Sequence, residues 1–261
     1  DLVKLDDEQL KKADRTLLLR GRDLRYARFD RADMRKADMF EAKLAGAVLV
    51  EARLDEANLQ GAELQGANLR AAQWPGADLS EAELLGANLS GSEMQGVNLN
   101  EAELQGADLS RAELQGADLT LAQLQGANLN RAQMQGANLS NAQLQGARLT
   151  YAELQGVYLG QARVEGSDLR SAHLQGANLN GAHMQGADLR GAKIWQMTAI
   201  GADFDVTQTK GTTAINPILE NDSARKKAKM RQYISNFISK IPDHYFCEKA
   251  ETRLLYSWKI L

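Results

Sequence analysis

The sequence predicts an all-β solenoid, a chain that coils around one long apolar core, and three observations support this fold class. From Leu24 to Ile194 every fifth residue is a large apolar side chain, and leucine fills 26 of these 35 places. Alanine stands two residues before the large side chain in 30 of the 35 cases. Glycine also ends alternate units from Gly66 to Gly186, which adds a period of ten. Self-similarity at a fixed short period is typical of repeat architectures.

A period of five fits neither a straight helix nor a flat strand. In an α-helix, residues five apart are rotated by roughly 140°, so the leucines would spread around the whole surface. In a strand, side chains alternate, so an odd period sends successive leucines to opposite faces. A chain that turns a corner once per unit buries all the leucines together. By strand parity the alanines then point inward as well, and three residues per unit face outward.

The repeating unit, which reads ANLQG, AELQG or ADLSR, resembles the pentapeptide-repeat family over about residues 22–206. This resemblance implies a right-handed, four-sided β-helix with coils of about 20 residues. The 35 units then make about nine coils, and the rod is roughly 40 Å long at the spacing of neighbouring strands.

The period of ten predicts the chemistry of the corners. Glycine suits a corner that needs a positive φ, such as that of a type II turn. Glutamine precedes the glycine in many units, and the stacked coils would align these side chains into two amide-bonded ladders on opposite sides. The glutamines of these ladders are Gln95, Gln105, Gln115, Gln125, Gln135, Gln145 and Gln155. Trp74 fills an inward leucine place before Pro75, and this pair predicts an irregular coil.

Both ends of the chain depart from the repeat, which divides it into three parts. Residues 1–21 predict an N-terminal cap with a short helix, residues 22–211 the β-helix, and residues 212–261 a C-terminal α-helical extension. A solenoid must cover its raw ends, so we expect one apolar helical stripe of the extension to cover the last coil. The other stripe either packs on the first or forms a homodimer interface. The candidates for such self-association are Tyr233, Phe237 and Trp258.

The motifs of catalysis and metal binding are missing from the sequence, so we expect no enzyme, no cofactor and no metal. There is no phosphate-binding glycine loop, nucleophile elbow or Cys/His metal spacing. His173 and His183 are ten residues apart, which places them on opposite sides of the rod, with His173 stacked between Glu153 and Lys193.

The cysteine content and the apolar runs give the expected localisation. The single cysteine, Cys247, favours a reducing compartment, and we expect a cytoplasmic protein. The apolar runs are shorter than a membrane span. The chain begins with Asp1 rather than methionine, so we expect a fragment of a longer protein whose membrane contacts, if any, come from segments outside it.

An acidic surface is the strongest candidate for a binding site. Four carboxylates share one predicted corner, with Glu81 and Glu83 on one coil and Glu101 and Glu103 on the next. A wider acidic band consists of Asp78, Glu93, Asp108, Glu113 and Asp118. The functional interpretations are a basic partner protein or a weakly held cation. The alternative is that the exposed glutamates extend into water and that salt screens their repulsion.

These observations favour a non-enzymatic scaffold for protein–protein interaction, as the soluble domain of a longer bacterial protein. The alternative comes from the resemblance, since some family members mimic DNA, pair through their C-terminal ends and bind a type II topoisomerase such as gyrase. The acidic band is compatible with this alternative. Against it, residues 119–150 contain Arg131 and Arg148 but no acid, and the register has no inserted loops. A strongly basic nucleic-acid footprint is absent along the rod, so we expect no direct nucleic-acid partner.

Overall fold

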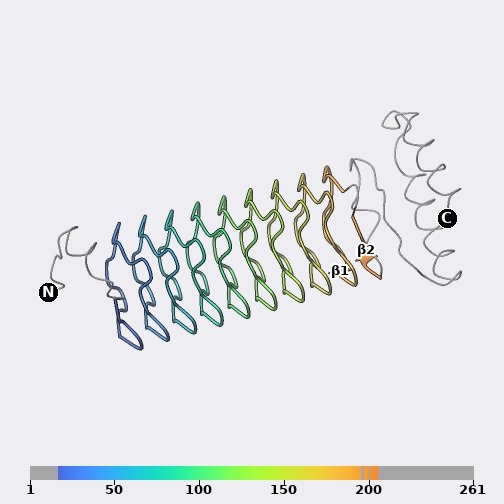
Figure 1. The fold of residues 1–261 in the computed structure, drawn as a ribbon. Coiled ribbons are helices and arrows are strands. Elements are labelled where there is room, and N and C mark those ends of the chain that lie inside the picture. The colour runs from blue at the N-terminus through green and yellow to red at the C-terminus, as the bar shows by residue number, and fades with distance from the viewer. Residues whose placement is uncertain (1–16, 195–196, 200, 205–261) are drawn as a thin grey trace, which may run out of the picture.

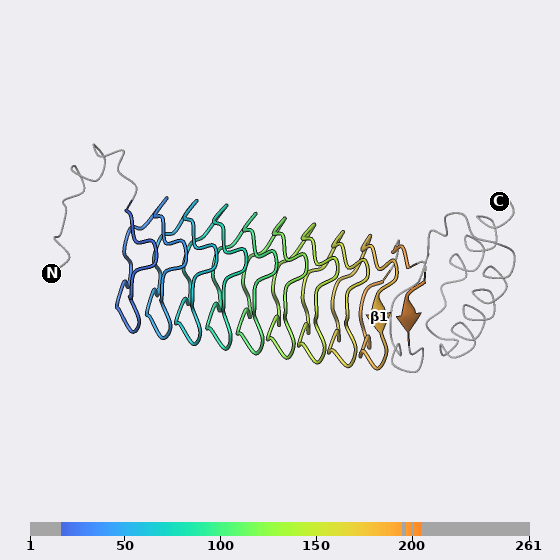
Figure 2. The same ribbon diagram turned by 90° about the horizontal axis from the view of Figure 1, so that it is seen from below.

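The computed structural model describes residues 17–194, 197–199 and 201–204, which form a straight rod (Figures 1 and 2). Parallel bridges join residues 20 apart, from Leu18–Asp38 to Asn178–Thr198, and they recur at every fifth residue. Each coil therefore contains four repeating units and has four sides. One pair of sides is long enough to form strands, β1 (His183–Met184) and β2 (Asp203–Phe204), which pair in parallel with His183 opposite Asp203.

Each corner is a turn that the backbone closes by itself. In the unit around Leu64, the Ala67 amide donates to the Leu64 carbonyl at 3.0 Å, and the third turn residue, Gly66, has a φ of 63°. The positive φ expected for the corner glycines is therefore confirmed. Glycine is not required, however, because 16 other residues, Glu81 (φ 60°) among them, adopt the same conformation.

Bonds between coils occupy most of the remaining amide groups. Leu64 N–H donates to the Glu83 carbonyl at 2.8 Å, and Gly66 N–H donates to the Leu85 carbonyl at 2.9 Å. Where aspartate or asparagine occupies the bridge position, its side chain accepts from the second turn residue, as Asp108 does from Ser110 N–H at 3.0 Å. Main chain and side chain together hold each coil in register with the next.

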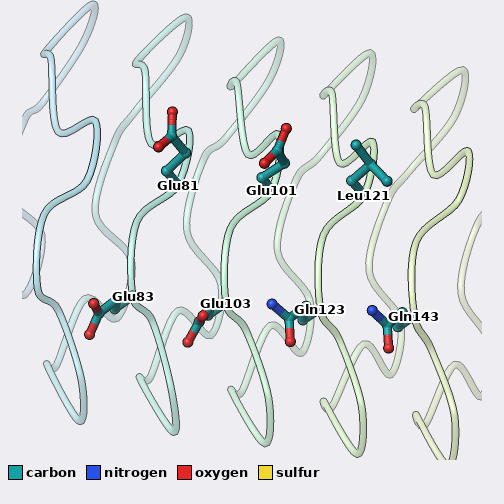
Figure 3. A pocket seen from close by; sticks show the side chains of 7 residues that line it. All are labelled: Glu81, Glu83, Glu101, Glu103, Leu121, Gln123 and Gln143. Atoms are coloured by element: carbon teal, nitrogen blue, oxygen red, sulfur yellow. The ribbon is translucent and has the colours of Figure 1, made fainter.

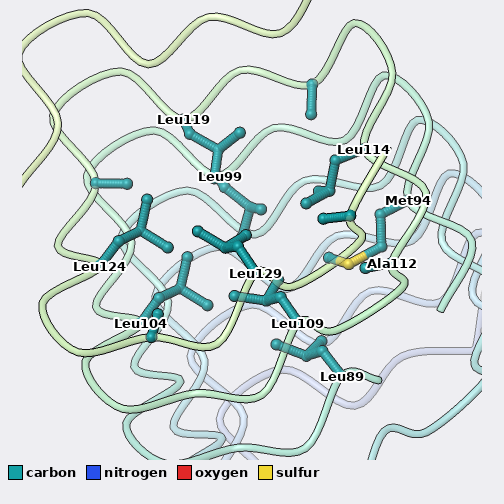
Figure 4. Close-up of a cluster of buried hydrophobic side chains, with 14 of the residues drawn as sticks. Leu89, Met94, Leu99, Leu104, Leu109, Ala112, Leu114, Leu119, Leu124 and Leu129 are labelled. Atoms are coloured by element: carbon teal, nitrogen blue, oxygen red, sulfur yellow. The ribbon is translucent and has the colours of Figure 1, made fainter. Parts of the chain in front are cut away.

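The interior of the rod is filled by the leucine and alanine places (Figure 4). From Ala37 to Ala199, both places of almost every unit are buried. Ser92 and Ser167 replace alanine, and their hydroxyls donate to the Leu89 and Val164 carbonyls at 2.7 and 2.8 Å. The inward orientation of the two apolar columns is thus confirmed.

The irregular coil expected at Trp74 is absent, because the bridges continue through Gln73 without a shift. Trp74 is fully buried in a leucine place, and its indole N–H has no partner within the described residues. Pro75 occupies the second position of the turn, where the fixed φ of proline suits a type II turn. The N–H of that position makes no main-chain bond to a neighbouring coil in other units, and the Pro75 carbonyl still accepts from Glu56 N–H at 3.1 Å, so proline removes no bond of the ladder.

The ladder begins earlier than the sequence suggested. Leu18 already bridges to Asp38, within the segment 1–21 that was assigned to a cap. The rest of the expected N-terminal helix lies in residues 1–16, outside the described residues. The expected helices of 212–261, with Tyr233, Phe237 and Trp258, also lie outside them. Within the described part of the chain, no helix has the length and apolar character that crossing a membrane requires.

Candidate functional site: an acidic corner

The four glutamates of the predicted corner come together in the structure (Figure 3). Glu81 and Glu101 are third turn residues on successive coils, and Glu83 and Glu103 bridge to each other on the adjoining side. Together with Leu121, Gln123 and Gln143 they line a shallow groove of about 380 Å³. We call these four glutamates the acidic corner.

Only half of the acidic corner is hydrogen-bonded within the rod. Gln60 Nε2 donates to Glu81 at 3.1 Å, and Gln65 donates to Glu83. The side chains of Glu101 and Glu103 make no hydrogen bond or ion pair with any described residue. These two carboxylates therefore remain available to a partner, and the described residues provide no cation to offset their repulsion.

The wider acidic band surrounds the rod instead of extending the corner. Asp78 and Asp118 both bridge to Asn98 on one side, whereas Glu93 and Glu113 bridge to each other on a different side. Most of these carboxylates accept bonds from amides of neighbouring coils. Asn98 donates to Asp78 at 2.9 Å, Asn128 to Asp108 at 2.8 Å and Gln95 to Glu113 at 2.6 Å.

The glutamine side chains connect the coils, but not as the sequence suggested. Gln105 donates to Gln123 at 2.8 Å and Gln125 to Gln143 at 2.8 Å, so each bond reaches the bridge residue 18 positions on. The predicted ladder between equivalent turn glutamines of successive coils is therefore wrong. The acceptor is instead the bridge residue of the next coil that directly precedes the equivalent turn, as Gln123 precedes the turn that contains Gln125.

The histidines are not brought together. His173 bridges to Glu153 and Lys193, as expected, and His183 Nδ1 lies 3.7 Å from Asp203. Among the residues that the structure describes, no group of three or more histidine, cysteine or acidic side chains could hold a metal ion.

A second charged corner was missed by reasoning from the sequence. Arg111, Arg131 and Tyr151 are third turn residues on three successive coils, ten residues out of phase with the acidic corner. The Arg131 guanidinium lies over the Tyr151 ring, 5.7 Å from its centroid. The sequence pattern that indicates this corner is the third turn place, where Arg111, Arg131 and Tyr151 stand at intervals of one coil while the units directly before and after each of them carry glycine.

Comparisons with known proteins place the chain in a family. The model described as pentapeptide repeats matches eight copies between residues 37 and 205. The structure of HetL, a pentapeptide repeat protein involved in heterocyst differentiation regulation in the cyanobacterium Nostoc, is 32% identical, covers 70% of this chain and 90% of its own, and has a TM-score of 0.29. A trypsin-treated variant of QnrB1, a plasmid-mediated fluoroquinolone resistance protein, is 19% identical over 70% of this chain and 93% of its own, with a TM-score of 0.38.

A third similar structure is a pentapeptide repeat protein of the Arabidopsis thaliana thylakoid lumen. It is 24% identical over 49% of this chain and 88% of its own, with a TM-score of 0.26. No curated protein matches the chain. The repeat ladder and the family match lead to one conclusion: this chain belongs to the pentapeptide repeat family, whose fold is a right-handed β-helical solenoid.

Proposed function

We propose that the rod is a non-enzymatic scaffold that binds a basic protein partner through the acidic corner. The observation that carries this proposal is the pair of unpaired carboxylates, Glu101 and Glu103, at a groove beside Glu81 and Glu83. A partner that supplies lysine or arginine side chains there would offset the repulsion between them. Leu121, 46% exposed at the end of the groove, adds an apolar contact.

The rigidity of the rod supports the same function. Each coil is bonded to the next along all four sides, and the core is continuous. A surface that is already formed loses little conformational entropy when it binds, so modest contacts suffice for affinity. The corner side chains are held at fixed spacing by the ladder beneath them.

A charge-matched pair of variants tests this function. The first replaces Glu81, Glu83, Glu101 and Glu103 by glutamine, and the second replaces Glu93, Glu113, Glu153 and Glu165 by glutamine. Both change the net charge equally, but only the first alters the acidic corner. Proteins captured from a bacterial extract on the immobilised chain should be lost with the first variant and retained with the second. Increasing salt should weaken the binding of these proteins. Equal capture by both variants at all salt concentrations would exclude the acidic corner as the binding site.

A second candidate is a DNA mimic that binds gyrase, and the acidic band is the observation that favours it. Residues 77–118 contain nine acidic side chains against Arg111 alone. The band is short, because it spans roughly two coils, or about 10 Å at the spacing of paired strands. The test is supercoiling by purified gyrase in the presence of the chain. This candidate would be excluded if the chain neither inhibited nor protected gyrase at micromolar concentration.

A further inference from the structure

The ten-residue period leaves side chains in the third turn place on only two edges of the central rod. From Gly66 and Gly76 onward, the third turn residue is glycine at every second corner. The other corners carry larger side chains in the third turn place of most units. Because each coil has four corners, these remaining corners lie half a coil apart, on opposite edges of the rod.

The two edges have matching patterns of opposite charge. Along one edge, Glu81, Glu101 and Leu121 follow one another at intervals of one coil, and we call this the acidic column. Along the opposite edge, Arg111, Arg131 and Tyr151 follow at the same interval, and we call this the basic column. Each column presents two like charges and then an exposed apolar side chain, since Leu121 is 46% and Tyr151 56% exposed. All six side chains are exposed.

Neither column forms an ion pair with the described residues of its own rod. Like charges on neighbouring coils stand about 4.8 Å apart at their backbones, so they repel along each column. Arg111 and Arg131 make no ion pair with a described residue, and the Arg131 guanidinium lies over the Tyr151 ring. Among the described residues Glu101 has no partner, and Glu81 accepts a single neutral amide. A surface with the opposite charges at the same spacing would relieve both columns at once.

We propose that a second copy of this chain provides that surface, with the acidic column of one rod lying along the basic column of another. With the rods parallel, Glu81 faces Arg111, Glu101 faces Arg131 and Leu121 faces Tyr151. The shared coil length keeps these three contacts in register. The proposal rests on the proposed function, because it names the partner of the same acidic corner.

The geometry of this contact sets its products. The two columns occupy opposite edges, so the contact is heterologous and each added rod leaves a free column on either side. Association therefore continues beyond a dimer, into rows of parallel rods. Exposed ion pairs contribute little each and are screened by salt, so the rows should form at high protein concentration and low ionic strength.

Charge reversal of each column tests the proposal with the full chain. Glu81→Arg with Glu101→Arg gives a rod with two basic edges, and Arg111→Glu with Arg131→Glu gives a rod with two acidic edges. Each exchange keeps a non-glycine residue at the same positive φ, and circular dichroism checks the fold. The control reverses Glu56 and Glu165, which lie on the other two corners.

Sedimentation velocity at low salt provides the readout. We expect species larger than a dimer for the unaltered chain and the control, and at least a tenfold loss of these species for each reversed variant alone. An equal mixture of the two reversed variants should restore them. The proposal is overturned if the unaltered chain forms no species beyond a dimer, or if the mixture fails to restore association.

The same variants separate this proposal from the proposed function. The rod with Arg111→Glu and Arg131→Glu keeps the acidic corner intact, so it should still capture a foreign basic partner while it no longer forms rows. Rows that persist in this variant would contradict the lateral contact, whereas loss of capture together with the rows would contradict the proposed binding of a foreign basic partner.

Discussion

The two ends of the rod pair their charges, whereas its centre does not. Seven ion pairs join described residues between Arg20 and Glu63, and four more lie between Arg163 and Arg190. Between residues 64 and 162 no ion pair joins described residues. The centre instead connects its coils through neutral amides, such as Gln115 to Gln133 at 2.9 Å. Charges in the ends are thus paired with opposite charges, whereas those of the centre either accept bonds from neutral amides or have no charged partner among the described residues.

The largest difference should come from the core, whose leucine places are fully buried in the centre and only partly buried at the N-terminal end. Leu109 is fully buried, and Leu109→Ala should lower the free energy of unfolding by about 3 kcal/mol through the cavity it leaves. Leu24 is only partly buried, and Leu24→Ala should cost about 1 kcal/mol. Urea unfolding of the two variants measures both values, and equal losses would contradict the comparison.

Two corner glycines should differ because of their neighbours. Gly126 has a φ of 67° and open space around it, so Gly126→Ala should cost about 1 kcal/mol from backbone strain alone. At Gly46 a Cβ atom would lie 2.6 Å from the Tyr26 ring, so Gly46→Ala must also displace that ring and should cost about 2 kcal/mol. Thermal unfolding gives the difference, and Tyr26→Ala in the Gly46→Ala background should remove the excess.

The amide bonds of the centre should be individually weak. Gln125 donates to Gln143 at 2.8 Å, but its own buried Oε1 has no partner among the described residues. Gln125→Met removes the donor together with the unsatisfied acceptor, so the free energy of unfolding should change by less than about 1 kcal/mol. A loss well above that value would show that the amide bonds act cooperatively along the rod.

The smallest effect should be the acid sensitivity of the ends. Hydrogen bonds from Arg25 hold the pKa of Asp23 at about 2, and Arg170 and Arg190 lower the pKa values of Asp168 and Asp188. A carboxyl whose pKa is lower in the folded chain stabilises it fully above the unfolded value, near 3.8, and this contribution is lost as the pH falls toward 2.

Carboxyl resonances followed by NMR between pH 5 and pH 2 would test this expectation. We expect Asp23 to titrate near pH 2 and Arg25→Gln to return it toward its ordinary value. Titration of Asp23 near pH 4 in the unaltered chain would show that the exposed pair is not formed in solution. The free-energy change should be small, because exposed ion pairs are screened by water and salt.

The sequence was sufficient for the architecture because burial follows directly from spacing. The inward places of Ala112 and Leu114, the stacking of equivalent units and the meeting of Glu81, Glu83, Glu101 and Glu103 all follow from one period. Contacts between outward side chains were harder to predict. The bond from Gln105 to Gln123 depends on side-chain length and on the path of the turn, and neither follows from the period. The regular coil at Trp74 and Pro75 likewise depends on which turn position has an N–H that makes no main-chain bond to a neighbouring coil.

The basic column escaped notice for a different reason. Arg111 and Arg131 are isolated cations in the linear sequence, and Tyr151 is one exposed aromatic among several. They form a pattern only when the third turn place is followed alone, one coil at a time. Stacking residues 20 positions apart likewise predicts the acidic corner.

The four-unit coil also acts as a reading frame for the surface. An insertion of one unit would keep every leucine inside, yet it would turn all later positions by a quarter of the coil and bring glycine corners above charged ones. An insertion of two units would exchange the two opposite edges downstream. Only whole coils lengthen the rod and leave each column continuous. In this protein, insertions and deletions therefore change which outward side chains stand above one another. Those whose length is a whole number of coils should be tolerated best.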